Sequence, residues 1–162
     1  MNNLSEMKPY HILLIFICAI CLFSACENNR VFESYGSISG NGWHKDSVLN
    51  YNFNIKDSAL NYNLYFNLRN TVDYPYSNIW LFVSIDPQHG NAITDTVEFI
   101  LAGPGGRWFG RGHGKYRDNK LIYQNNVFFP DTGIYRFNVQ QGMRDNVLEG
   151  INDFGIRVEK VK

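Results

Sequence analysis

The sequence predicts an all-β fold: an antiparallel β-sandwich, immunoglobulin-like or jelly-roll-like, with one short helix and preceded by a signal peptide. Aromatic residues make up 15% of the chain and charged residues only 19%, a composition that favours strands. Apolar and polar residues alternate with a period of two along several segments, and turn signals separate them. No repeat of about 20–50 residues is visible, which argues against a propeller or a solenoid.

Residues 1–25 have the organisation of a bacterial lipoprotein signal peptide. Lys8 supplies a positive charge, and the apolar segment from Ile12 to Phe23 is too short to span a bilayer. The segment ends in the letters FSAC, in which small residues precede a cysteine. We therefore predict cleavage before Cys26 and lipidation of its thiol. The alternative is an ordinary secretory signal with a chance cysteine.

The leader also accounts for the other two cysteines. Cleavage removes Cys18 and Cys21, so their C-x-x-C spacing is not a redox or metal motif. Acyl chains on Cys26 would hold the protein to a membrane of the cell envelope, on the periplasmic side or at the cell surface. We expect residues 26–42 to form a tether with a short strand at 31–35, and residues 43–162 to form a single β-sandwich domain.

The strands follow from the alternation of apolar and polar residues. Segments 49–55 and 60–68 are predicted to form an antiparallel hairpin around a turn at Asp57-Ser58. Residues 78–85 are apolar on both faces, which predicts a central strand covered on both sides. Further strands are expected at 95–102, 121–123, 127–129, 134–140 and 156–161.

Residues 141–150 form the one predicted helix. Met143, Val147 and Leu148 recur at helical spacing, and Gly150 is placed to cap the end. This helix would lie between the strands predicted at 134–140 and 156–161.

A D-x-G-x-Y pattern occurs at Asp131, Gly133 and Tyr135. In immunoglobulin-like sandwiches this pattern forms a tyrosine corner, in which the hydroxyl bonds back to the upstream backbone. Two interpretations stay open: a true corner, or a glycine-led strand start with Tyr135 in the core.

Several function classes are disfavoured. Fifteen basic and 15 acidic residues give no basic excess, so we expect no nucleic-acid binding. The glycine-rich segment from Pro104 to Tyr116 lacks the spacing and the following helix of a phosphate cradle. His44, His89 and His113 lack metal-ligand spacing. No nucleophile motif is present, and no pair of carboxylates stands out. The residue patterns therefore predict no metal site and give no positive sign of catalysis.

Two loops combine aromatic residues with arginines, which dominate the energetics of protein interfaces. We predict that residues 73–78 and 103–116 form a partner-binding surface with Tyr74, Tyr76, Arg107, Trp108 and Arg111. The plainer alternative is that both loops only connect strands.

The three tryptophans suggest a second kind of site, a platform on which sugars stack. Trp43 and Trp108 follow or adjoin glycine-rich stretches, so we expect them to be exposed. Trp80 lies in an apolar strand and is expected in the core.

Several blocks together resemble a known family: an early Trp43, the cysteine motif at Cys26, LRNTVDYPYSNIWLFV, GPGGRWFGRGHG and FPDTGIYRFNVQQGMRDNVLEGINDFGIRVEK. They are similar to the GldH-type gliding-motility lipoproteins of Bacteroidetes-group bacteria, over nearly the whole mature chain. The resemblance implies an envelope lipoprotein that aids assembly or stability of the motility and secretion apparatus, with other envelope proteins as partners. The resemblance also implies no enzyme activity and no cofactor, and only Cys26 carries over as a functional residue. The alternative is a carbohydrate-binding surface lipoprotein that captures glycans.

Overall fold

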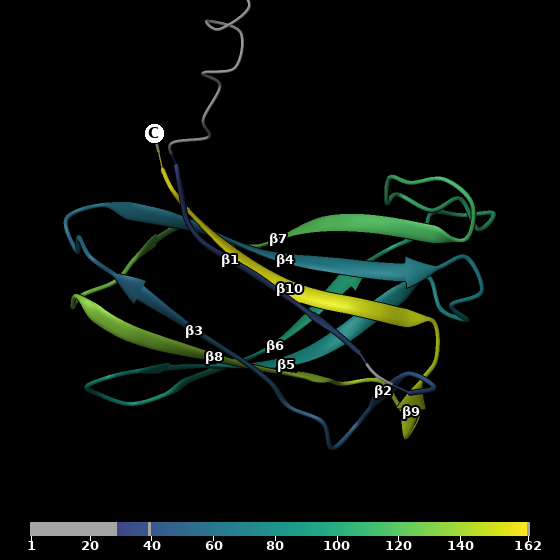
Figure 1. Cartoon of the computed structure of the whole chain (residues 1–162), viewed down its shortest axis with the longest axis horizontal. Helices are drawn as coiled ribbons and strands as arrows, with labels where there is room; N and C mark the ends of the chain where they lie inside the picture. Colours follow the sequence, from purple (N-terminus) through teal and green to yellow (C-terminus); the bar gives the residue numbers. More distant parts are fainter. Residues whose placement is uncertain (1–28, 39, 162) are drawn as a thin grey trace, which may run out of the picture.

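Two four-stranded antiparallel sheets face each other across an apolar core (Figure 1). The computed structural model describes residues 29–38 and 40–161, and within them it contains strands and no helix. The predicted all-β sandwich is therefore confirmed, whereas the signal peptide and Cys26 lie outside the described residues. The strands are β1 (Arg30–Ser37), β2 (Trp43–His44), β3 (Leu49–Ile55), β4 (Asn61–Thr71), β5 (Asn78–Pro87), β6 (Ile93–Ile100), β7 (Tyr116–Phe128), β8 (Gly133–Gln141), β9 (Val147–Leu148) and β10 (Ile151–Lys160).

The strand order is that of a jelly roll, the second of the two predicted alternatives. One sheet has the order β1-β10-β4-β7 and the other β3-β8-β5-β6, while β2 and β9 form a small separate pair. Among the eight long strands, each crosses to the opposite sheet at its next connection, except that β5 and β6 are joined as a hairpin. This double-sheet arrangement is characteristic of jelly rolls.

The predicted hairpin at 49–55 and 60–68 is wrong, although both strands exist. β3 pairs with β8, whereas β4 pairs with β10 and β7 in the other sheet. The Asp57 carboxylate accepts a hydrogen bond from the Ala59 amide at 2.9 Å, and the Asp57 carbonyl accepts one from the Tyr62 hydroxyl at 2.5 Å. These bonds fix a turn that carries the chain from one sheet to the other.

The predicted helix at 141–150 is also wrong. The Gln141 side chain accepts a hydrogen bond from the Met143 amide and donates one to the Asp145 carbonyl, both at 2.8 Å. These side-chain bonds compete with helical ones and hold an irregular turn. Val147 and Leu148 then pair with His44 and Trp43 as β9 and β2.

The central strand β5 is covered on one face only, contrary to the prediction. Ile79, Leu81 and Val83 are buried, but Trp80 is 38% exposed and Phe82 is 48% exposed on the outer face. Side chains in this apolar run therefore alternate between the core and the solvent as in the other strands, and two aromatic residues occupy the solvent side.

Tyr135 satisfies both interpretations of the D-x-G-x-Y pattern. Its ring is buried, and its hydroxyl donates to the Asp131 carbonyl at 2.9 Å. Gly133 between them has φ 130°, which L side chains rarely adopt. The bond pins the connection where the chain crosses from β7 to β8.

All connections gather at two ends of the sandwich. β1 begins and β10 ends at one of them, which we call the N-terminal end, together with connections 56–60, 88–92 and 129–132. The opposite end, which we call the loop end, carries connections 72–77, 101–115 and 142–150 as well as the β1–β3 connection. The strand expected at 31–35 is longer, because β1 pairs with β10 from Arg30 to Ser37.

A buried tyrosine links the two sheets directly. The Tyr51 hydroxyl on β3 donates to the Phe154 carbonyl on β10 at 2.8 Å. Burial raises the pKa of Tyr51 from 10.0 to about 12, because the charged phenolate would be desolvated.

This shift predicts a loss of stability at alkaline pH. The contribution of Tyr51 should be complete below its unfolded pKa of 10.0 and be lost as pH rises to about 12. Tyr51→Phe should cost about 1 kcal/mol at neutral pH through the lost hydrogen bond. It should also remove roughly 2 kcal/mol of the alkaline decline. Urea unfolding across this pH range measures both, and equal slopes in the two proteins would contradict the assignment.

Candidate partner-binding surface

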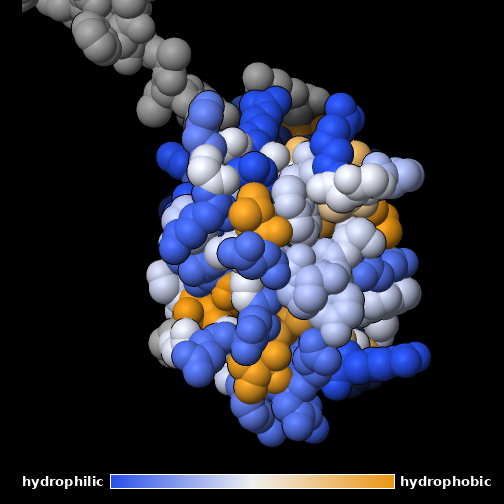
Figure 2. Space-filling model, turned by 90° about the vertical axis from the view of Figure 1, so that its right-hand side faces the viewer, coloured by the Kyte–Doolittle hydropathy of each residue, from blue (hydrophilic) through white to orange (hydrophobic). Residues whose placement is uncertain are grey.

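The loop end brings together all five residues predicted to bind a partner. Tyr74 and Tyr76 lie between β4 and β5, whereas Arg107, Trp108 and Arg111 lie between β6 and β7. Figure 2 shows this end face-on, with clusters of apolar atoms separated by polar ones. Two loops about 30 residues apart in the chain thus contribute to one surface.

Tyr74 forms the aromatic centre under this surface. Its ring lies 6.3 Å from that of Trp108 and 5.8 Å from that of Tyr76, measured between centroids. The Tyr74 hydroxyl donates to the Asn78 carbonyl at 2.9 Å, and burial raises the pKa of Tyr74. Because Tyr74 is buried, its predicted contact role is wrong: it supports Trp108 from below.

Tyr76 is held by a second loop of the same end. Its hydroxyl donates to the Asp145 carboxylate at 2.7 Å, a bond that raises the pKa of Tyr76. Asp145 belongs to connection 142–150, whose turn is fixed by Gln141. Tyr76 therefore joins two connections of the loop end and remains partly accessible.

The glycine-rich loop is a compact β-like turn. The Gly103 amide donates to the Arg107 carbonyl and the Phe109 amide to the Leu101 carbonyl, both at 2.9 Å. Gly105 and Gly106 have φ of 81° and 77° at the tip, a conformation that favours glycine. The glycines thus close a turn, which agrees with the absence of a phosphate-cradle motif.

A second turn follows directly, and its two arginines, Arg111 and Arg117, have different roles. Arg111 and Asp118 exchange backbone hydrogen bonds at 2.9 and 2.7 Å. The Arg117 guanidinium donates to the carbonyls of Gly114 and Tyr116 within this turn, at 2.8 and 2.7 Å. Arg117 therefore stabilises the loop.

Arg107 and Arg111 project from the two turns with their guanidinium groups available. Both are exposed, and neither side chain forms a hydrogen bond or ion pair with the residues that the structure describes. Phe109, between them, is 55% exposed. Arginine and aromatic side chains in this combination are typical of protein interfaces.

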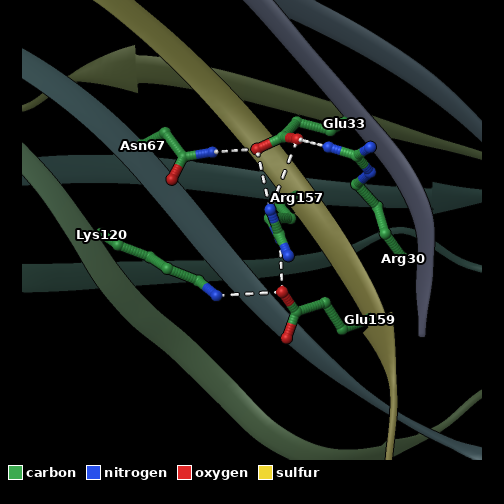
Figure 3. Close-up of polar contacts among 6 residues, drawn as sticks. All are labelled: Arg30, Glu33, Asn67, Lys120, Arg157 and Glu159. Atoms are coloured by element: carbon green, nitrogen blue, oxygen red, sulfur yellow. Dashed lines mark hydrogen bonds and ion pairs between the residues drawn. The ribbon is translucent and has the colours of Figure 1, made fainter. Parts of the chain in front are cut away.

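The outer face of the sheet β1-β10-β4-β7 carries an ion-pair network (Figure 3). Arg157 lies between Glu33 and Glu159, and Lys120 pairs with Glu159 at 2.9 Å. Arg30 pairs with Glu33 at 2.6 Å. Burial alone would raise the pKa of Glu159, but the hydrogen bonds from Lys120 and Arg157 outweigh it and lower the pKa. Every carboxylate of the network is paired with a basic group. The network therefore links β1, β10 and β7 and stabilises the sheet.

The structure places the three tryptophans differently from their predicted exposure. Trp43 is only 1% exposed and packs on Phe154 at 5.2 Å, so its expected exposure is wrong. Trp80 is exposed rather than in the core. Trp108 is half-buried against Tyr74. The predicted pairing of Trp43 with Trp108 as a sugar platform is therefore not formed.

Metal binding finds no support in the described part of the chain. No group of three or more histidine, cysteine, aspartate or glutamate side chains there is arranged to hold an ion. Nor does a helix long and apolar enough to cross a membrane occur within residues 29–38 and 40–161.

Comparison with known proteins identifies the family. The sequence model described as GldH lipoprotein matches residues 30–158. The chain belongs to the GldH lipoprotein family. The resemblance noted in the sequence is thereby confirmed, and GldH membership supports an envelope lipoprotein of gliding motility that is anchored to a membrane.

Two GldH relatives cover almost the entire chain. The "Gliding motility lipoprotein GldH homolog" of Christiangramia forsetii is 42% identical over an alignment of 161 positions that covers 95% of this chain and 98% of the relative. The "Gliding motility lipoprotein GldH" of Flavobacterium johnsoniae is 38% identical over an alignment of 154 positions that covers 91% of this chain and 94% of the relative. No solved structure matches the chain.

Sequence reasoning missed the residues of this GldH chain that position the surface. Gly150 has φ 82°, and a Cβ there would lie 2.9 Å from the Tyr74 Cα. Its carbonyl also accepts a hydrogen bond from the Thr71 amide at 2.8 Å. Gly150 was predicted only as a helix cap, because the pattern of one segment carries no sign of its packing against residues 72–77.

This close approach predicts a difference between two glycines with the same backbone conformation. Gly105 has φ 81°, and a Cβ there would meet nothing within 4 Å. Gly105→Ala should therefore cost only the conformational strain, about 1 kcal/mol. Gly150→Ala adds a steric clash with the Tyr74 backbone and should cost about 2 kcal/mol more. Chemical denaturation of both variants tests this, and equal losses would contradict the packing.

Proposed function

We propose that the protein is a lipid-anchored, non-enzymatic component of the cell envelope that supports gliding motility as an assembly or stability factor of the motility and secretion apparatus. Lipidation of Cys26 provides the anchor, and the loop end provides the contact with another envelope protein. The observation that carries the proposal is that Arg107 and Arg111 flank exposed Phe109 and have no side-chain partner among the described residues, on a loop whose Trp108 packs on buried Tyr74.

Three further observations support a binding role over catalysis. The loops at this end are fixed by backbone hydrogen bonds, so the surface is formed before a partner arrives. The described carboxylates of the ion-pair network are satisfied by basic groups, which suits a structural function. Relatives of the chain carry names that refer to motility and to no reaction.

The proposed contact is tested by charge reversal. Arg107→Glu with Arg111→Glu should abolish gliding when the protein is expressed in Flavobacterium johnsoniae that lacks its own GldH protein. Interface arginines contribute about 2 kcal/mol each, so the double variant should lose about 4 kcal/mol. Recovery of the partner through a crosslinking residue introduced at position 109 should then fall on the order of a thousandfold. Spreading on agar and crosslinked yield are the measurements.

A matched control separates binding from folding. Arg136→Glu makes one charge reversal of the same kind on the outer face of β8, where the Arg136 guanidinium donates to the Asn52 side-chain oxygen at 3.3 Å. We expect that variant to glide and to crosslink normally. If the double variant glides as well as the control at equal protein level, the loop end is not the contact surface.

Glycan binding is the second candidate function, and one observation favours it. Trp80 and Phe82 are neighbours on the solvent face of β5. Phe82 lies between Thr96 on β6 and Gln140 on β8, and Trp80 lies opposite Glu98 on β6. The Phe82 ring rests on Gly142, where a Cβ would come within 3.3 Å of it. Aromatic rings flanked by hydroxyl and amide groups suit a sugar.

The glycan candidate makes a separate prediction. If this face binds sugar, Trp80→Ala should lower retention on purified envelope polysaccharide by roughly tenfold while the arginine pair remains dispensable for it. Affinity electrophoresis measures the retention. Unchanged retention, or none in the unmodified protein, would leave the protein contact as the function.

A further inference from the structure

The chain just after Cys26 is fixed to one end of the sandwich. The Lys160 amide donates to the Asn29 carbonyl at 2.8 Å, so Asn29, three residues after Cys26, is held at the end of β10. Three residues span at most about 11 Å when fully extended. This step rests on the proposed lipidation of Cys26, which would hold the N-terminal end within that distance of the lipid.

The N-terminal end lies far from the loop end. Figure 1 shows the C terminus and the start of β1 together at the left, with the long loops at the right. β4 runs between the two ends with eleven residues, a length of roughly 35 Å. The end of the sandwich next to the proposed lipid anchor is therefore opposite the end that carries the candidate partner-binding surface.

Three large apolar side chains are exposed at the N-terminal end. Ile93 begins β6 and is 63% exposed, Phe128 ends β7 and is 60% exposed, and Ile134 near the start of β8 is 54% exposed. They come from both sheets, so they surround the end rather than mark one edge. Side chains of this type insert at the boundary between headgroups and acyl chains.

Charge does not select anionic lipid here. Arg30, Lys56 and Lys160 are exposed at this end, and so are Asp57 and Asp131 on its connections. Arg30 is paired with Glu33. The Asp57 carboxylate is already bound by the Ala59 amide. Mixed charge together with exposed Ile and Phe suits contact with the interface of a bilayer whether or not the lipid is anionic.

We infer that the N-terminal end rests on the membrane, with Ile93, Phe128 and Ile134 in the lipid interface and the strands standing away from the bilayer. The short chain after Cys26 prevents the domain from drifting clear of the surface. The loop end then points away from the lipid at a height of roughly 35 Å.

Single-cysteine labelling of the acylated protein tests this orientation, because Cys26 is the mature chain's only native cysteine and its thiol is blocked by lipid. A polarity-sensitive dye is attached to Ile93→Cys, Phe128→Cys or Ile134→Cys, with Phe109→Cys at the loop end as the control. The labelled proteins are placed in phosphatidylcholine vesicles that carry nitroxide on the acyl chains, and iodide is added outside.

The three labels at the N-terminal end should be quenched by the nitroxide lipid, and their iodide quenching should fall by about half or more on reconstitution. The label at position 109 should respond to iodide alone. Equal iodide access at all four positions would overturn the inference, as would shielding that appears in cells but not in vesicles. Mass spectrometry distinguishes the failures: an unacylated Cys26 sinks the proposed anchor, whereas an acylated protein with equal access sinks only the orientation.

Discussion

The packing of Phe66 between the sheets is the contact on which the fold depends. Its ring lies 4.7 Å from Tyr123 and 5.3 Å from Phe154 in its own sheet, and 5.8 Å from Phe99 and 6.3 Å from Phe137 in the facing sheet. Four different neighbouring strands therefore meet at one side chain. Aromatic contacts add about 0.5–1.5 kcal/mol each beyond burial, which lets a domain without disulfides hold its two sheets together.

The strands themselves were predictable, because burial on one face leaves a local period of two in the sequence. Their pairing was not: the alternation in 49–55 fits a hairpin with 61–71 as well as the observed pairing with β8. Only the turn at Asp57 decides between them, through bonds that no pattern of residue types reveals. The same limit explains the misplaced helix, where the side chain of Gln141 overrides the helical spacing.

The candidate site was predictable in composition but not in depth. Arginines and aromatics in two loops pointed to the loop end, and the structure gathers them there. Burial separates their roles: Tyr74 lies beneath the surface, while Arg107 and Arg111 reach out from it. The depth of Tyr74 arises from its packing against Gly150, which is distant in the chain. A family match adds the biological setting, but it does not place these contacts.

The position of β10 sets the order in which its sheet can fold. The last strand in the sequence lies between β1 and β4, so the first strand has no partner in its sheet until residues 151–160 are present. Pairing across so much of the chain is slow to form. A chain that emerges with its N terminus first can therefore complete this sheet only after its final segment is present.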